Sequence, residues 1–138
     1  FCGSAGLAHA CHAVGFAAYA VDWSGNKHIS KVPVLYYDLT TQAGQQAAWE
    51  LIKTANVRYI HLGPPCGTFS RAREKRLPYW ARKRGAPQPQ PLRSEEHPGG
   101  LPKLKGIDLE KEVKANILVS FTAQVAQYCT EKNNRVLL

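Results

Sequence analysis

The chain has 138 residues, 44% hydrophobic and 20% charged, which predicts one globular domain. Its apolar stretches are too short to cross a bilayer, and its beginning lacks the basic leader of a secretory signal, so neither a membrane protein nor a secreted one is expected. The four cysteines (Cys2, Cys11, Cys66 and Cys129) show no metal-binding or disulfide spacing, which favours a reduced intracellular chain without a metal.

The net charge of +8 is concentrated in one part of the chain. The window from Gly67 to Ile107 holds ten Lys and Arg and three Glu, which gives it a net charge of +7. Positive charge gathered in this way favours a polyanion such as nucleic acid as the partner. Composition alone leaves a solvated, disordered insert as the alternative.

A helix followed by two strands is predicted at the start of the chain. The helix covers residues 4–15, where apolar residues recur at helical spacing before a glycine: Leu7, Cys11, Val14 and Gly15. The strands cover residues 16–22 and 32–39, and each carries an acid at or next to its end, Asp22 and Asp38.

The second half continues the alternation around a long interruption. A helix is predicted over residues 40–55, with its apolar stripe on Ala48, Leu51, Ile52 and Ala55. A third strand over residues 57–62 leads into Pro64, Pro65 and Cys66. Residues 67–106 are rich in proline, so a long loop without helix or central strand is expected there.

The last predicted elements are a long helix over residues 108–132 and the opening of a strand over residues 135–138. The apolar stripe of that helix is predicted on Val113, Ile117, Phe121 and Val125. Alternating strands and helices indicate the α/β class with a parallel sheet. Because the chain begins at a turn and ends within a strand, we expect a fragment of a larger domain with exposed, aggregation-prone strand edges.

The glycine-rich turn "FCGSAG" precedes the first predicted helix, where α/β sheets commonly bind nucleotide-like ligands. Gly3 and Gly6 allow close approach of backbone to a ligand, although helix caps use such residues too. An acid about 20 residues further on is expected to bind ribose hydroxyls, and Asp22 meets this spacing. Trp23 could lie on an adenine ring, and Asp38 would line the same edge of the sheet.

Cys66 follows the third predicted strand, and the residues leave its role open between nucleophile and core side chain. Pro64 and Pro65 fix two backbone angles next to the thiol, and the following arginines favour the thiolate. A buried cysteine would instead act as a small apolar residue. A metal ligand is disfavoured because no second Cys or His stands at ligand spacing.

The segments "FCGSAGL", "YAVDW", "YYDL" and "GPPCGTFSRAR", in this order and spacing, resemble the N-terminal half of the DNA (cytosine-5) methyltransferase family. That family has a glycine-rich turn after Phe, an acid that closes the second strand, and a Pro-Cys nucleophile. The resemblance covers nearly the whole chain and implies a partial Rossmann-like, S-adenosylmethionine-dependent methyltransferase fold. Its parts would be residues 1–66 (cofactor half), 67–107 (basic loop) and 108–138 (helix and next strand).

The resemblance also implies roles for individual residues. Asp22 would take the ribose hydroxyls, Trp23 would stack on adenine, and Cys66 would attack the cytosine ring. The cofactor-binding set is Phe1, Gly3, Ser4, Ala5, Gly6, Leu7, Asp22, Trp23, Asp38, Leu39 and Pro64. The set on the mobile loop that closes on nucleic acid, expected to be double-stranded DNA, is Ser70, Arg71, Arg73, Lys75 and Arg76.

Two positions depart from the family pattern: Ala5 replaces a glycine, and Gly67 stands where Gln is common. The Glu that the family needs is expected after residues 135–138, so the chain alone is expected to be inactive. Two other interpretations remain: a catalytically inactive nucleic-acid-binding relative, derived from a mobile element, or a generic Rossmann-like domain with Cys66 in its core. The family implies a nuclear location in a eukaryote.

Overall fold

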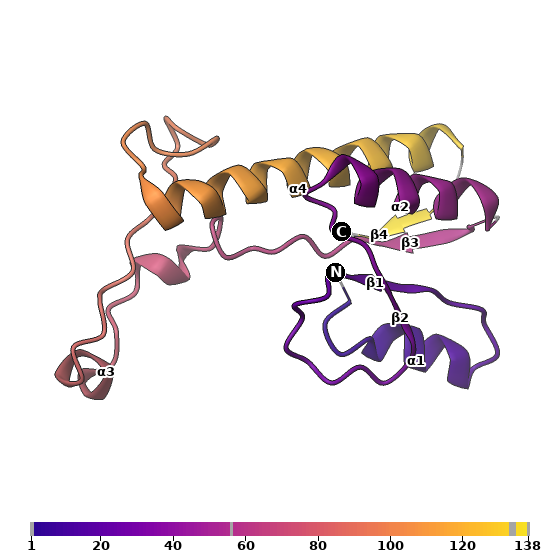
Figure 1. The fold of residues 1–138 in the computed structure, drawn as a ribbon, viewed down its shortest axis with the longest axis horizontal. Coiled ribbons are helices and arrows are strands. Elements are labelled where there is room, and N and C mark those ends of the chain that lie inside the picture. Colours follow the sequence, from indigo (N-terminus) through magenta and orange to yellow (C-terminus); the bar gives the residue numbers. More distant parts are fainter. Residues whose placement is uncertain (1, 56, 133–134, 138) are drawn as a thin grey trace. The chain divides into compact units, whose positions relative to one another are not determined.

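The structure, a computed structural model, describes residues 2–55, 57–132 and 135–137. The chain divides into two compact units, the first comprising Phe1–Pro64 with Ile117–Leu138 and the second Pro65–Asn116. Figure 1 shows helices and short strands along the chain, and the mixed α/β class predicted from the sequence is confirmed. In chain order the elements are α1 (Gly6–Ala13), β1 (Ala20–Asp22), β2 (Val34–Tyr36), α2 (Gln42–Thr54), β3 (Tyr59–His61), the 3-10 helix η1 (Arg71–Glu74), α3 (Tyr79–Lys83), α4 (Gly106–Glu131) and β4 (Arg135–Leu137).

The strands form two parallel pairs in the described part of the first unit. β1 pairs with β2, with Ala20 opposite Val34, and β3 pairs with β4, with Tyr59 opposite Arg135. Every predicted strand is therefore present, but only three residues of each form the paired strand. Parallel strands need a crossover connection, and α4 lies in the connection between β3 and β4.

The main core of the first unit lies between α2 and α4. Trp49 of α2 packs edge-to-face on two aromatic side chains of α4, at ring-centroid distances of 5.8 Å to Phe121 and 5.3 Å to Tyr128. This geometry suits the quadrupoles of aromatic rings. The buried residues of this core are Leu39, Ala48, Leu118, Phe121, Val125 and Cys129.

The predicted apolar stripe of α4 is correct at one end and wrong at the other. Phe121 and Val125 are buried as predicted, whereas Val113 is exposed. Residues spaced by four drift by about 40° per step around a helix with 3.6 residues per turn, so the stripe leaves the buried face. At the start of α4, Glu112 and Ala115 occupy that face instead.

The predicted stripe of α1 is wrong. Leu7 and Val14 are exposed, and Val14 lies beyond the last helical residue. The helix buries Ala8, which packs with Ala5 and Ala20 in a small cluster. Alanine side chains allow close approach of the helix to β1, so the contact between the two elements is made by small residues rather than by large apolar ones.

The proline-rich segment is folded, which corrects the expectation of a loop without helices. It contains η1 and α3, and Leu92 is almost completely buried. Gly85, at φ +75°, ends α3, because a residue with positive φ stops a helix at little cost only when it is glycine. Pro78 immediately precedes α3. The N–H groups at the start of a helix have no partner within the helix, so a proline there costs no hydrogen bond.

Candidate functional site

The carboxylate of Asp22, at the end of β1, holds the glycine-rich turn. Its Oδ2 accepts hydrogen bonds from the backbone N–H of Cys2 (2.9 Å) and Gly3 (3.0 Å) and from Nδ2 of Asn26 (3.0 Å). Its Oδ1 accepts a hydrogen bond from the backbone N–H of Trp23 at 2.9 Å. Asp22 is only 5% exposed, so these charge-assisted bonds fix the path of the turn.

Asn26 is a member of this site that the sequence interpretation missed. Its Nδ2 also donates to the carbonyl of Gly3 at 2.6 Å, and its Oδ1 accepts from the backbone N–H of His28 at 3.0 Å. One side chain thus joins the turn to the segment that follows β1. The only sequence signal is an Asn four residues after the acid, which is also typical of ordinary turns.

Ala5 occupies a backbone conformation that glycine normally takes. Its φ is +54°, in the left-handed region, and it is the N-cap residue of α1 without a side-chain acceptor. Its methyl group is buried in the cluster with Ala8, which offsets part of the strain of this conformation. Gly3 has the same φ, and a Cβ there would meet no atom within 4 Å, so space is open beside the turn.

The indole of Trp23 lies against the backbone of Gly25. A Cβ at Gly25 would stand 2.4 Å from Cη2 of the indole, so only glycine permits this packing. Trp23 is nevertheless 55% exposed, which leaves much of the ring accessible to a ligand.

Asp38 and Leu39 connect β2 to α2. Asp38 is exposed, and its Oδ1 accepts hydrogen bonds from the backbone N–H (3.0 Å) and Oγ1 (2.6 Å) of Thr40. The Leu39 side chain is buried in the core with Phe121, and its carbonyl accepts a hydrogen bond from Gln45 Nε2 at 2.9 Å. Leu39 therefore offers its backbone rather than its side chain to any ligand at this edge.

Cys66 is exposed, which contradicts the interpretation of a core cysteine. Its carbonyl accepts hydrogen bonds from the backbone N–H groups of Phe69 (3.0 Å) and Ser70 (2.8 Å), and these bonds close a tight turn. The Oγ of Ser70 in turn accepts from the backbone N–H of Ala72 at 3.1 Å and begins η1. The thiol is thus presented on a fixed turn immediately before the basic segment.

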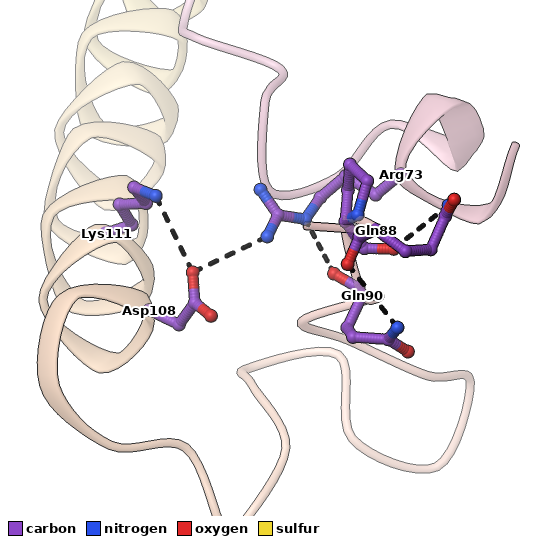
Figure 2. A network of polar contacts seen from close by, with 6 residues as sticks. Arg73, Gln88, Gln90, Asp108 and Lys111 are labelled. Carbon is purple, nitrogen blue, oxygen red and sulfur yellow. Dashed lines mark hydrogen bonds and ion pairs between the residues drawn. The ribbon is translucent and has the colours of Figure 1, made fainter. Parts of the chain in front are cut away.

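The predicted nucleic-acid-binding cations have different surroundings. Arg71 is exposed and forms an ion pair with Glu74 at 3.2 Å. Arg73 is held inside the unit, where its Nε donates to the carbonyl of Gln90 at 2.7 Å and its guanidinium pairs with Asp108 at 3.5 Å (Figure 2). Lys75 and Arg76 are exposed, and neither pairs with an acid among the described residues.

The structure brings Gly3, Asp22 and Trp23 together in the first unit, which also contains Asp38 and Pro64. The other described residues of the predicted cofactor set lie in the same unit, and Phe1 lies outside the described residues. Cys66 and the predicted nucleic-acid-binding residues belong to the second unit.

Neither a metal site nor a membrane-spanning helix is found in residues 2–55, 57–132 and 135–137. No group of three or more His, Cys, Asp or Glu side chains there could hold a metal ion. None of the helices in this part has the length and apolarity that a membrane crossing requires. A shallow groove on α2 and α4 contains no predicted site residue, and its lining is Gln42, Gln45, Gln46, Trp49, Lys53 and Tyr128.

Comparison of the chain with protein-family models, curated proteins and solved structures finds no match.

The cysteines are expected to differ in their rates of alkylation. Burial, and secondarily the nearby Asp22 carboxylate, raise the pKa of the Cys2 thiol, and burial raises the pKa of Cys129. Because the thiolate is the reactive form, iodoacetamide at neutral pH should label the exposed Cys66 about tenfold faster than Cys2 or Cys129. Peptide mass spectrometry over a time course measures these rates.

The control for this experiment is the chain in denaturant, where all four cysteines should react at similar rates. Labelling of Cys2 or Cys129 in the folded chain as fast as Cys66 would contradict the burial that the structure gives them.

Proposed function

We propose that the protein is an S-adenosylmethionine-dependent DNA methyltransferase that modifies C5 of cytosine through a covalent bond to Cys66. The observation that carries this proposal is the presentation of Cys66. Its thiol is exposed, its carbonyl closes a rigid turn after a parallel strand, and the basic segment begins directly behind it. A nucleophile acting on a polyanion needs this combination of an accessible sulfur and nearby positive charge.

The parallel strand pairs support the finer fold assignment, a Rossmann-like methyltransferase domain of which this chain forms part. The carboxyl end of β1 leads into Asp22, which bonds to the glycine-rich turn, and this is the edge at which such folds bind their ligands. The turn and the acid are therefore connected physically, as well as by their spacing in the sequence.

The residues at this edge fit an adenosyl ligand in three respects. The space beside Gly3 is open, the Trp23 ring is half exposed, and Asp22 Oδ1 accepts one hydrogen bond among the described residues. A ribose hydroxyl would donate to this Oδ1, because Oδ2 already accepts three hydrogen bonds. S-adenosylmethionine, when bound, supplies an electrophilic methyl group.

The proposed role of Cys66 follows from the electronic structure of cytosine, whose C5 is a poor nucleophile. The Cys66 thiolate forms a bond to C6, and the electron pair of the C5–C6 double bond makes C5 nucleophilic. After C5 gains the methyl group, a base removes the C5 proton, the double bond re-forms, and the thiolate leaves C6. The cytosine must first leave the duplex, since C6 is otherwise out of reach. Lys75 and Arg76 would bind the flanking phosphates.

A trapping experiment on the full-length protein tests this proposal. In the presence of S-adenosylmethionine, an oligonucleotide that carries a cytosine analogue with fluorine at C5 has no C5 proton to lose after methyl transfer, so the protein should stay covalently bound. Cys66→Ser should abolish the adduct in denaturing electrophoresis, whereas Cys11→Ser should leave it unchanged. Wild type and Cys66→Ser behaving alike would refute the role of the thiol. Binding of DNA without any adduct would favour the catalytically inactive relative.

A further inference from the structure

We propose that residues 75–84 form a binding site for unpaired nucleobases, in which Trp80 and Tyr79 stack on bases and the surrounding cations bind the adjoining phosphates. The proposal shares with the proposed function only the premise that the partner is nucleic acid. It adds base stacking by Tyr79 and Trp80, which contact neither the cofactor nor the target cytosine. Lys75 and Arg76 of the predicted loop set are the only residues shared with the proposed function.

The composition of residues 75–84, "KRLPYWARKR", suits single-stranded nucleic acid. Five of the ten residues are Lys or Arg and none is acidic. Tyr79 is 71% exposed and Trp80 is 61% exposed, although large aromatic side chains are usually covered. Aromatic rings interleaved with positive charge are the combination that binds single strands, because every base offers a flat face and every nucleotide a phosphate.

The cations of this segment are available, which is not true of the whole second unit. Residues 65–116 are all described, and five of their cations form ion pairs with acids of the same unit: Arg71, Arg73, Arg93, Lys111 and Lys114. None of the five cations of residues 75–84 forms such a pair. Arg84 lies over the Trp80 ring, with its guanidinium carbon 5.6 Å from the ring centroid, so cation and aromatic ring already form one surface.

The segment is held in place by hydrogen bonds at its base. The side chain of Gln88 donates to the carbonyl of Lys75 (2.8 Å) and accepts from the backbone N–H of Leu77 (3.0 Å). Beyond α3, the backbone N–H of Ala86 donates to the carbonyl of Ala81 at 3.1 Å, and Ala81 is buried. The exposed rings therefore extend from an anchored loop, which reduces the entropy lost on binding.

Arg73 connects this loop to the start of α4. Figure 2 shows its guanidinium between the carbonyl of Gln90 and the carboxylate of Asp108, which Lys111 also contacts at 3.6 Å. Gln88 is linked to Gln90 in the same view, because its carbonyl accepts a hydrogen bond from Gln90 Nε2 at 3.5 Å. Arg73 therefore acts as a positioning residue, and the phosphate contacts fall to the exposed cations of residues 75–84.

Unpaired bases are favoured over an intact duplex because duplex bases are stacked on one another and offer no free face to Trp80. A membrane surface is disfavoured because α3 has five residues and carries two large aromatic side chains rather than a continuous apolar face. Where a base has been taken out of a duplex, its former partner on the opposite strand is left unpaired, so such a contact agrees with the proposed chemistry.

Fluorescence anisotropy with a labelled single-stranded thymidine oligonucleotide tests the proposal. Trp80→Ala should weaken binding about tenfold or more, since stacking contributes roughly 1–3 kcal/mol per base. Trp80→Tyr should retain most of the affinity for the single strand. Trp80→Ala should change the affinity for the duplex of the same sequence by less than about twofold. The matched control is Tyr19→Ala, which removes another exposed aromatic ring outside every proposed site and should leave the affinity unchanged. Replacing Arg82 and Lys83 by Gln should make the slope of the logarithm of the binding constant against the logarithm of the salt concentration less steep. The slope should change by about 0.7 per lost phosphate contact.

Three results would overturn the proposal: no binding of the oligonucleotide by the wild type, equal affinities of wild type and Trp80→Ala, or tighter Trp80-dependent binding to phosphatidylserine vesicles than to the oligonucleotide. Failure of the proposed function would look different. A missing Cys66 adduct with Trp80-dependent binding intact refutes the methyl-transfer chemistry alone. An intact adduct with binding insensitive to Trp80→Ala refutes the stacking site alone.

Discussion

An Arg93→Met variant is expected to lose about 3–5 kcal/mol of unfolding free energy at neutral pH, the range found when one partner of a buried ion pair is removed. Arg93 contacts Glu112 at 2.6 Å, and both side chains are nearly buried. The substitution leaves the Glu112 carboxylate without its countercharge in a place that water does not reach. Urea unfolding followed by circular dichroism measures the loss.

Arg93 connects more of the second unit than its ion pair alone. Its guanidinium donates to Asn116 Oδ1 (2.9 Å) and Thr68 Oγ1 (3.2 Å), and it lies 3.6 Å from the centroid of the Phe69 ring. These contacts join the proline-rich segment to α4 and to the turn that carries Cys66. We therefore expect the loss of Arg93 to loosen that turn as well as to destabilise the unit.

The cost should depend on pH in a defined direction. Burial raises the pKa of Glu112 above its ordinary value, and Arg93 opposes this rise. A carboxyl group whose pKa is raised by folding stabilises the fold below its unfolded pKa and loses that contribution as the pH rises through the folded pKa. Arg93→Met removes the positive charge that lowers the pKa of Glu112. The loss of unfolding free energy relative to the wild type should therefore be largest at neutral pH and shrink as Glu112 becomes protonated in acid. A deficit independent of pH would contradict this assignment.

Two further variants make the comparison specific. Arg71→Met removes a cation whose ion pair with Glu74 is exposed, and it should cost less than about 1 kcal/mol. The double variant Arg93→Met with Glu112→Leu removes both buried charges, and most of the lost stability should return. Failure of the double variant to recover would mean that the other contacts of Arg93 carry its effect.

Gly44→Ala is expected to destabilise the protein by about 1–3 kcal/mol, although alanine is the better helix former by about 1 kcal/mol. Gly44 lies in the first turn of α2, and a Cβ there would stand 2.1 Å from the carbonyl oxygen of Asp38. That carbonyl belongs to a connection fixed by hydrogen bonds from Thr41, so it has little freedom to move.

The control for Gly44→Ala is Gln46→Ala, an exposed position in the same helix, which should be neutral within about 0.5 kcal/mol. Thermal unfolding of the two variants beside the wild type measures the difference. Stabilisation by Gly44→Ala would show that helix propensity outweighs the close contact with Asp38.

Local sequence patterns were sufficient for much of the first unit. Ala48 at helical spacing and the β-branched runs around Val34 and Ile60 locate α2, β2 and β3, because each pattern reflects the burial of one face. The same patterns located α1 and α4, but the predicted buried stripe was wrong in α1, where the contact with β1 uses alanines, and at Val113, where the buried face of α4 contains Glu112. Neither small-residue contacts nor a buried charge produces an apolar period.

In the candidate site, too, some residues could be predicted from local spacing and others could not. The spacing of Gly3 and Asp22 predicted that both would line one ligand site, and the structure places them in direct hydrogen-bond contact. The roles of Asn26 and Arg93 depend on partners brought near by the fold, and composition does not distinguish Arg93 from the other cations of its window. Local spacing therefore indicated the candidate site residues, whereas the residues that hold them in place required the structure.

The attachment site of the trapped base tests the central claim most directly. Protease digestion of the covalent complex formed with the fluorinated cytosine analogue, followed by tandem mass spectrometry, identifies the modified cysteine. The account predicts the nucleotide adduct on the peptide that contains Cys66 and on no other cysteine. An adduct on Cys2, Cys11 or Cys129, or one that persists in Cys66→Ser, would contradict it.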